Sequence, residues 1–347
     1  MDTSPQLSSR ERYSRQVLFG PIGGDGQQRL TEASVAIIGC GALGSAIAET
    51  LTRAGVGELH LVDRDYVEWS NLQRQQLFAE SDAEQMLPKV EAARLRLLKI
   101  RSDLVLHTYF DDLDAALIRN LASKCSLIMD ATDNFETRLL INDAALEAGI
   151  PWIYGACVGS SGSVFPFVPD RSACFRCLLP TLPAANDTCD TAGIIAPAVQ
   201  MTAAMQSAEA LKWLSGNREA LLTKIHHFDL WNGSRLDTGI ARIRQADCPS
   251  CGAAPSYPAL ARTNRSAYAA LCGRDTVQVL PDRERPVTLD DAERIARRLD
   301  GPFRRTPHFV EFHALGARFI LFMNGRLLIH GAGSVEEGRN LHRKVFG

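Results

Sequence analysis

The sequence predicts an α/β fold: a doubly wound, mostly parallel, Rossmann-like sheet with an antiparallel extension, followed by a small C-terminal α/β domain. Two observations carry this prediction. Short apolar runs alternate with helical patterns through the first half of the chain, and a glycine-rich turn follows the first run. A third observation, a pair of Cys-x-x-Cys motifs, predicts a zinc site with four cysteine ligands in the larger domain.

The composition narrows the class of protein. The chain has 347 residues, 46% of them hydrophobic, and a formal net charge of −2. The length favours two domains, and the charge gives no sign of a nucleic-acid or membrane partner. The polar N-terminus has no apolar core, so we expect no secretory signal. The longest uncharged stretch, at 34–48, is shorter than the ~20 residues of a spanning helix. We therefore expect a cytoplasmic enzyme, in which cysteines indicate metal binding or catalysis sooner than disulfides.

The elements of the larger domain follow in order. Apolar runs predict strands at 35–38, 59–62, 105–109, 127–129 and 152–154. Helical patterns between them lie at 43–53, 89–98, 113–122 and 135–147. After Gly155 the pattern changes to antiparallel strands at 163–168, 224–229 and 234–242, with a long helix at 197–214.

A polar, proline-containing stretch at 255–265 marks a boundary, so we expect domains at 1–262 and 263–347. The second domain has predicted strands at 276–279, 309–313, 318–322 and 327–329, and helices at 289–299 and 335–345. Asn324-Gly325 between two apolar runs is a strong hairpin signal.

The glycine turn predicts a nucleotide site. Gly39 permits a tight turn, Gly41 lets backbone N–H groups approach a phosphate, and Gly44 lets the helix pack close to the strand. Asp63, at the end of the second strand, is placed to accept from ribose hydroxyls. These residues alone leave NAD and ATP equally open.

The next residues favour a triphosphate. Asp65, Asn71, Arg74 and Gln75 follow the second strand, and an arginine fork pairs well with phosphate oxygens. Lys89 begins a helix, where a cation is disfavoured by the helix dipole. A bound phosphate would explain a lysine at this position. A solvated surface charge explains Lys89 equally well.

Two aspartates end another parallel strand, at the sheet edge where ligands bind in such folds. A carboxylate there suits Mg²⁺, which takes one or two carboxylates together with substrate phosphates. We assign that role to Asp133 and a structural role, such as helix capping, to Asp130.

Four of the nine cysteines form the predicted zinc site, and they are Cys174, Cys177, Cys248 and Cys251. A redox pair and chance spacing are the alternatives. Cys189, in a small polar loop before a helix, is either a nucleophile or an inert thiol. The remaining cysteines have apolar surroundings typical of core residues, and they are Cys40, Cys125, Cys157 and Cys272.

Together these motifs resemble the ThiF/MoeB/HesA family, the bacterial relatives of ubiquitin-activating enzymes. The matching elements are RYSRQ at 12–16, GCGALGS, DRDYVEWSNLQRQ, PKVEAA, DATDNFETR, both Cys-x-x-Cys pairs and TCDTAGIIAP, in family order. The resemblance implies a homodimer that uses Mg-ATP to adenylate the C-terminal glycine of a ubiquitin-fold sulfur carrier ending in Gly-Gly. It also implies a sulfur donor, either a cysteine desulfurase or a rhodanese-like protein.

The resemblance assigns roles by position. Nucleotide contacts would be Gly39, Gly41, Ala42, Leu43, Gly44, Asp63 and Asn134. Phosphate-side residues would be Asp65, Asn71, Arg74, Gln75 and Lys89, with Asp133 on the magnesium. Arg15 would reach the ATP of the partner subunit, and Cys189 would lie on the crossover loop.

The chemistry agrees with this assignment, because a terminal carboxylate with a pKa of about 3.3–3.7 is already ionised and needs no general base. The C-terminal domain resembles the tail of some ThiF-type enzymes and favours thiamin over molybdopterin biosynthesis. The alternatives are adenylation of a peptide C-terminus in natural-product biosynthesis, an NAD-dependent oxidoreductase, and a catalytically silent zinc-stabilised binding partner.

Overall fold

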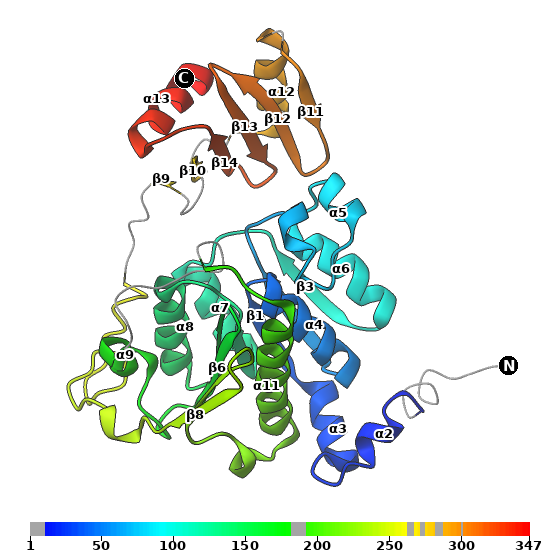
Figure 1. Cartoon of the computed structure of the whole chain (residues 1–347), viewed down its shortest axis with the longest axis vertical. Helices are drawn as coiled ribbons and strands as arrows, with labels where there is room; N and C mark the ends of the chain where they lie inside the picture. The colour runs from blue at the N-terminus through cyan, green and yellow to red at the C-terminus, as the bar shows by residue number, and fades with distance from the viewer. Residues whose placement is uncertain (1–10, 182–191, 262–266, 271–274, 282–286, 300) are drawn as a thin grey trace, which may run out of the picture. The chain divides into compact units, whose positions relative to one another are not determined.

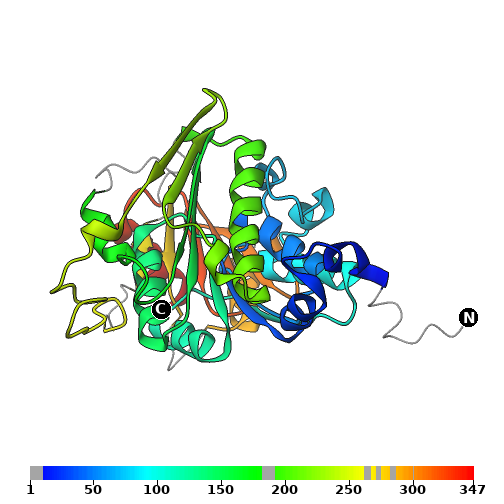
Figure 2. The same cartoon turned by 90° about the horizontal axis from the view of Figure 1, so that it is seen from below.

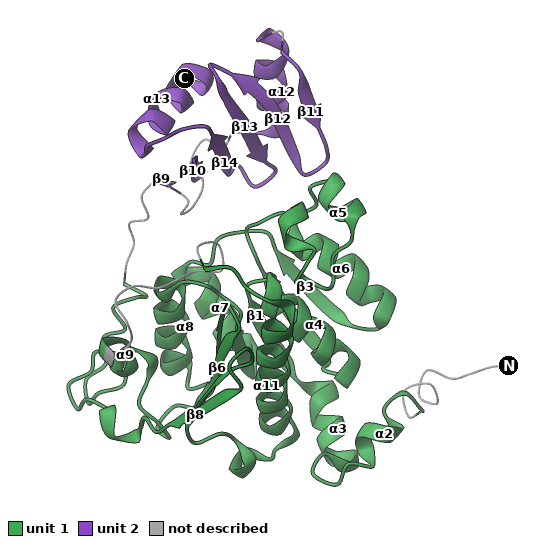
Figure 3. Ribbon diagram, in the orientation of Figure 1, with its two compact units in different colours: residues 1–262 green, residues 263–347 purple. Residues whose placement is uncertain are grey.

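A computed structural model of the protein describes residues 11–181, 192–261, 267–270, 275–281, 287–299 and 301–347. The chain forms two compact units, Met1–Arg262 and Thr263–Gly347, which Figure 3 distinguishes by colour. Within the described ranges, every helix is too short or too polar to cross a lipid bilayer.

Unit 1 contains a sheet of eight strands in the order β3-β2-β1-β4-β5-β6-β7-β8. Its strands are β1 (Ser34–Ile38), β2 (Glu58–Val62), β3 (Val105–Tyr109), β4 (Leu127–Asp130), β5 (Trp152–Val158), β6 (Ser161–Phe167), β7 (Ile225–Asp229) and β8 (Ser234–Thr238). Strands β1 to β5 pair in parallel, and β5 to β8 pair antiparallel. The predicted parallel sheet with an antiparallel extension is therefore confirmed.

Helices cover both faces of this sheet (Figure 1, Figure 2). One face carries α3 (Gly23–Glu32), α4 (Ala42–Ala54), α6 (Lys89–Ile100) and α11 (Ala196–Ser215). The other carries α7 (Ala115–Lys124), α8 (Phe135–Ala148) and α9 (Phe175–Leu178). Two further short helices are α2 (Ser14–Val17), which contacts α3, and α5 (Glu80–Glu84), whose Ala83 joins the core of the first face. Every residue of β1 is buried, as a central parallel strand covered on both faces requires.

Unit 2 is a six-stranded antiparallel sheet in the order β11-β12-β13-β14-β10-β9. Its elements are β9 (Tyr268–Ala270), β10 (Thr276–Val279), α12 (Leu289–Arg298), β11 (Phe303–Arg305), β12 (Phe309–Ala314), β13 (Ala317–Phe322), β14 (Leu327–His330) and α13 (Val335–Phe346). Both helices pack against the apolar side of the sheet. The predicted hairpin forms, with Gly325 at φ +79° and its N–H donating to the Phe322 carbonyl (2.9 Å).

Candidate nucleotide site and metal centre

In the glycine turn between β1 and α4, two glycines are required by close backbone contacts, and the third has open space beside it. Gly39 has φ +94°, and a Cβ there would lie 2.5 Å from the Ala131 carbonyl oxygen. A Cβ on Gly44 would overlap the Gly39 carbonyl oxygen. A Cβ on Gly41 would meet only Gln75 Nε2, at 3.8 Å. Gly41 therefore faces free space at the carboxyl edge of the sheet, where ligands bind in this class of fold.

Ala42 and Leu43, between the second and third glycines, begin α4. The Leu43 side chain is buried in the core, whereas Ala42 is half-buried. Their backbone therefore lies at the N-terminus of a 13-residue helix, whose N–H groups and dipole favour an anion.

Asp63 fastens the glycine turn to the end of β2. Its Oδ2 accepts from the Cys40 backbone N–H and its Oδ1 from that of Asp65, each at 2.7 Å. Burial raises the pKa of Asp63 above its usual range, against the opposing charge of Lys89. The carboxylate that was predicted to meet a ribose thus also holds the turn in shape.

Lys89 is buried at the first position of α6, 8% exposed. Its Nζ lies 3.4 Å from Asp65 Oδ2, and its backbone N–H donates to the Asp65 carbonyl at 2.9 Å. Burial alone would lower the pKa of Lys89, but the carboxylates of Asp65 and Asp63 outweigh it and raise that pKa. The ammonium is therefore charged. Cys40 Sγ contacts the Lys89 carbonyl at 3.9 Å, so the start of α6 lies beside the glycine turn.

A short turn after β2 supplies three further predicted residues. Asn71 Oδ1 accepts from the Glu68 N–H (3.1 Å), and the Asn71 carbonyl accepts from the Gln75 N–H (2.9 Å). Gln75 is 3% exposed, and its Oε1 has no hydrogen-bond partner among the described residues. Arg74, half-buried, donates from Nη1 to the Ser70 carbonyl (2.8 Å). An unsatisfied amide oxygen beside the glycine turn is typical of a ligand site.

The end of β4 is organised by a buried ion pair. Asp130 is fully buried, and its Oδ2 accepts from Arg138 Nε at 3.0 Å. Arg138 also donates to the carbonyls of Thr132 (2.6 Å) and Gly155 (3.0 Å). Burial would lower the pKa of Arg138, but the Asp130 carboxylate reverses this and raises it. Asp130 is thus structural, with Arg138, a residue that the sequence interpretation missed, as its partner.

Asp133 and Asn134 follow on the same loop. Asn134 caps α8, since its Oδ1 accepts from the Thr137 N–H at 2.8 Å, and its Nδ2 donates to Asp133 Oδ1 at 3.3 Å. Asp133 is exposed. The Ala131 N–H donates to the Ile38 carbonyl (2.9 Å), so this loop lies directly beside the glycine turn. The carboxylate is therefore open to a cation at the same sheet edge.

Arg15 lies elsewhere in unit 1. It is exposed on α2, where neighbouring Gln16 donates from Nε2 to the Ala54 carbonyl (2.8 Å) at the C-terminus of α4. The glycine turn is at the opposite end of that helix, about 18 Å away at 1.5 Å per residue. Figure 1 shows α2 beside α3, below α4. Arg15 therefore does not reach the glycine turn of its own chain.

The four zinc-predicted cysteines converge. Their Sγ atoms all lie within 4.8 Å of one another, with separations of 3.9 Å (Cys174–Cys177), 3.8 Å (Cys174–Cys248) and 3.6 Å (Cys177–Cys251). Four sulfurs at 2.3 Å from a tetrahedral zinc would be separated by about 3.8 Å, whereas a disulfide needs about 2.05 Å. This buried four-cysteine cluster is consistent with a zinc site.

Hydrogen bonds fix both Cys-x-x-Cys knuckles to α8. Asp143, fully buried, accepts from Ser250 Oγ (2.5 Å) and Arg176 Nη2 (3.0 Å). Asn142 Oδ1 accepts from the Phe175 N–H (2.9 Å). A Cβ on Gly252 would lie 2.6 Å from two backbone carbonyl oxygens, so the second knuckle requires glycine. These contacts fix the positions of both knuckles relative to α8.

The other cysteines separate into two groups. Cys40, Cys125 and Cys157 are buried, as predicted for core residues, and burial raises the pKa of Cys125 to about 11. Cys189 and Cys272 lie outside the described residues.

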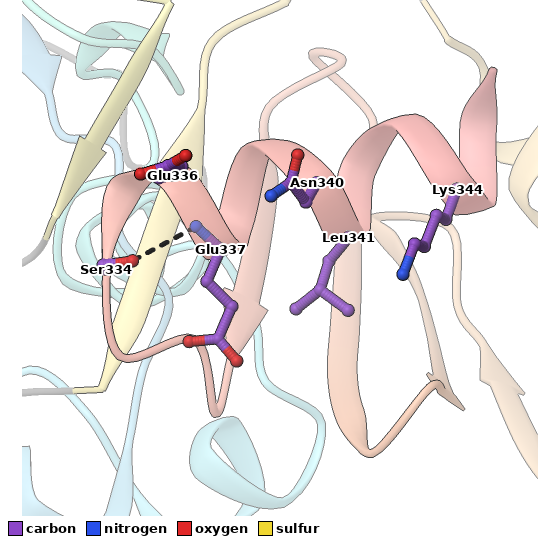
Figure 4. Close-up of a pocket in the computed structure, with 6 residues that line it drawn as sticks. All are labelled: Ser334, Glu336, Glu337, Asn340, Leu341 and Lys344. Carbon is purple, nitrogen blue, oxygen red and sulfur yellow. Dashed lines mark hydrogen bonds between the residues drawn. The ribbon is translucent and has the colours of Figure 1, made fainter.

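Unit 2 has an open depression on the surface of α13, with a volume of about 400 Å³ (Figure 4). It is lined by Ser334, Glu336, Glu337, Asn340, Leu341 and Lys344. The Glu337 N–H donates to Ser334 Oγ (3.2 Å), an ordinary helix cap. The predicted site residues that the structure describes all lie in unit 1, so this depression contains none of them.

Comparisons with known proteins give a consistent result. A model described as the ThiF family matches residues 13–252. A Bacillus subtilis protein named sulfur carrier protein ThiS adenylyltransferase is 45% identical over 336 residues, 97% of this chain and 99% of that protein. An Escherichia coli molybdopterin-synthase adenylyltransferase is 35% identical over 250 residues, 71% of this chain and 99% of that protein. The crystal structure of E. coli MccB with ATP is similar in fold, with a TM-score of 0.60 at 24% identity, covering 70% of this chain and 73% of that one.

Proposed function

This chain belongs to the ThiF family, and from that membership we propose that it is an adenylyltransferase acting on a sulfur-carrier protein. It uses ATP to activate the C-terminal glycine of a ubiquitin-fold carrier, ThiS-like or MoaD-like, so that sulfur can be transferred to it. The observation that carries the proposal is the glycine turn, whose open face at Gly41 is flanked by Gln75 and by the buried Lys89, which pairs with the half-exposed Asp65.

Thiamin biosynthesis is the favoured pathway. The relative named for ThiS is matched over 97% of this chain, so the match extends into Thr263–Gly347. The molybdopterin-synthase relative is less similar, at 35% identity compared with 45%. We therefore assign unit 2 to docking of the carrier or of its sulfur donor.

ATP binds with its phosphates over the glycine turn and its ribose against Asp63. The backbone N–H groups at the start of α4 donate hydrogen bonds to phosphate oxygens. Arg74 and Lys89 neutralise their charge, and Asn71, Gln75 and Asn134 supply amide groups around the nucleotide. Asp65 holds the Lys89 ammonium, 3.4 Å from its Oδ2, in position.

The reaction is a displacement at the α-phosphorus. A carboxylate oxygen of the carrier's terminal glycine forms the new P–O bond, the bond to the β-phosphate breaks, and pyrophosphate leaves. Both the transition state and the leaving group are anionic, so catalysis consists of neutralising charge. The exposed Asp133 carboxylate fits Mg²⁺, which would supply positive charge at the phosphates when bound.

Arg15 acts on the site of the partner subunit in a homodimer. Since Arg15 lies at the far end of α4 from its own glycine turn, a phosphate contact requires a second copy of the chain. In a two-fold dimer both sites gain the same contact.

The four-cysteine cluster holds one structural Zn²⁺. All four thiols are used, so the metal has no open coordination position and takes no part in the chemistry. Cys189 is the remaining candidate for a covalent intermediate after adenylation.

The test is intact-mass analysis of candidate carriers after incubation with the full chain and Mg-ATP. We expect one added adenylate on a carrier ending in Gly-Gly, and ATP–pyrophosphate exchange only when that carrier is present. A carrier shortened by its terminal glycine is the matched control. Adenylation of an unrelated peptide with no effect on any carrier would support the peptide-modifying alternative. The absence of ATP binding together with tight NADH binding would overturn the proposal.

A further inference from the structure

A second group of metal-ligating side chains lies on the edge strands of unit 1, away from the four-cysteine cluster. Glu58 and His60 are on β2, and His107 is on β3 directly opposite His60 in the parallel register. Residues two apart on a strand share a face, so all three side chains are on the same side of the sheet. It is the side covered by α7 and α8, because His60 pairs with Ala36 of that core.

The three ligating atoms converge on one point. Glu58 Oε1 lies 3.0 Å from His107 Nε2 and 3.2 Å from His60 Nε2. The two imidazole rings stack with centroids 4.6 Å apart and an interplanar angle of 15°. Ligands at 2.0–2.2 Å from a tetrahedral metal are separated by about 3.3 Å, close to both N–O distances.

His60 provides an independent observation. It is 3% exposed, yet its Nε2 makes no hydrogen bond within the described part of the chain, despite its closeness to Glu58. Its Nδ1 lies 3.2 Å from the Tyr109 hydroxyl. A proton on Nδ1, donated to Tyr109, leaves a buried lone pair on Nε2 that has no hydrogen-bond partner among the described residues. Hydrogen-bond partners on the far ring nitrogen orient metal-binding histidines in this way.

The charge and solvent exposure of these three residues also suit the binding of a metal ion. The Glu58 and His107 side chains are 37% and 48% exposed, so an ion can enter from solvent and keep a water as a fourth ligand. Lys124, at the end of α7, is a positive charge near His60 that would repel a metal ion. The Glu58 carboxylate lies in direct contact with the rings and is the nearer charge.

We propose that Glu58, His60 and His107 form a second metal site that takes a divalent transition-metal ion of the zinc class. Two imidazoles and one carboxylate are a ligand set typical of Zn²⁺ with an open position. The ion ties the edge strand β3 to β2. The site is independent of the adenylation reaction, since Glu58 lies at the opposite end of β2 from Asp63.

The experiment begins with the full chain carrying one Zn²⁺ per subunit in the four-cysteine cluster, with excess metal removed. Zn²⁺ is then titrated by calorimetry in a weakly coordinating buffer. We expect one further equivalent to bind. His107→Ala and Glu58→Gln should weaken this binding by roughly tenfold or more. Both residues are partly exposed, so neither change threatens the fold.

The matched control is His226→Ala, which removes a histidine that contacts Asp237 (2.6 Å) on the other edge of the same sheet. This variant should keep the second equivalent. Co²⁺ added to the same protein should give weak visible bands without the thiolate charge-transfer band of a cysteine site. The proposal is overturned if the wild-type chain binds no second ion or if His107→Ala binds it equally well. Carrier adenylation is measured separately, and its failure would leave this result unaffected.

Discussion

The Lys89 ammonium lies 3.4 Å from Asp65 Oδ2, and the backbone N–H of the same lysine donates to the Asp65 carbonyl. One aspartate thus fixes both the start of α6 and the direction of a buried cation. A lysine held in this way would lose less entropy on binding a phosphate.

Replacement of Lys89 by Met should therefore lower carrier-dependent ATP–pyrophosphate exchange by roughly a hundredfold or more, since one donor to a developing anion is worth about that much. The comparison is Lys99→Met, an exposed lysine at the other end of α6. It should exchange normally. Equal losses in the two variants would show that the effect is on the helix and not on phosphate.

The three glycines of the turn should separate binding from stability. Gly41→Ala places a methyl group in open space, so the fold should persist while ATP affinity, measured by calorimetry, falls at least roughly tenfold. Gly44→Ala forces a clash with the Gly39 carbonyl and should lower the melting temperature instead. Normal ATP binding by a folded Gly41→Ala chain would argue that phosphate does not lie over this turn.

Arg15→Ala should abolish exchange, and mixing it with Lys89→Ala should recover activity. Random exchange of subunits leaves about a quarter of all sites with both residues intact. Arg12→Ala, a neighbouring exposed arginine whose Nη1 donates to the Ile100 carbonyl (3.3 Å), is the control and should stay active. Mixtures that form heterodimers without regaining activity would contradict a contribution across the dimer.

The buried pair of Asp130 and Arg138 should be costly to break. Arg138→Met leaves a buried carboxylate without its cation and should lower the free energy of unfolding by about 3–5 kcal/mol, measured in urea. Arg119→Met is the surface counterpart, since Arg119 Nε pairs with Glu147 at 2.7 Å while half-exposed. That change should cost about 0–1 kcal/mol. Similar costs in both variants would mean that the Asp130 carboxylate is neutral when buried.

Removal of the predicted zinc should destabilise unit 1. The full chain should contain one tightly held Zn²⁺ by elemental analysis, and Cys251→Ser should lose it together with a large drop in melting temperature. Cys157→Ala, at a buried cysteine outside the cluster, should lower the melting temperature slightly and keep the metal. A metal-free protein of full stability would instead favour four neutral thiols.

Local sequence signals were sufficient for most of the fold. Each predicted strand of the parallel sheet has a counterpart, because a continuous apolar run between turn residues has few other solutions. The strands β9 and β11 were missed, as three residues each are too short to show a period. β11, Phe303–Arg305, is moreover two-thirds arginine, a composition typical of an exposed edge.

The sequence indicated candidate site residues where polar side chains directly follow a strand. It did not indicate residues that meet only through tertiary contacts. Arg138 looks like an ordinary charged residue on a helix, and only the turn after β4 shows that it is buried against Asp130. His60 and His107 are far apart in the sequence, and no pattern in either strand predicts that their rings stack. Their meeting depends on the pairing of β2 with β3, which no local pattern specifies.

The four cysteines also enclose a loop, since Cys174 and Cys248 are 74 residues apart. Within that loop lie α11 and the last two strands of the antiparallel extension, β7 and β8. A cross-link closing a loop of this length removes about 4–5 kcal/mol of chain entropy from the unfolded state. With metal bound, separation of β7 and β8 from the rest of the sheet would therefore gain less entropy, which favours unfolding of unit 1 in one cooperative step.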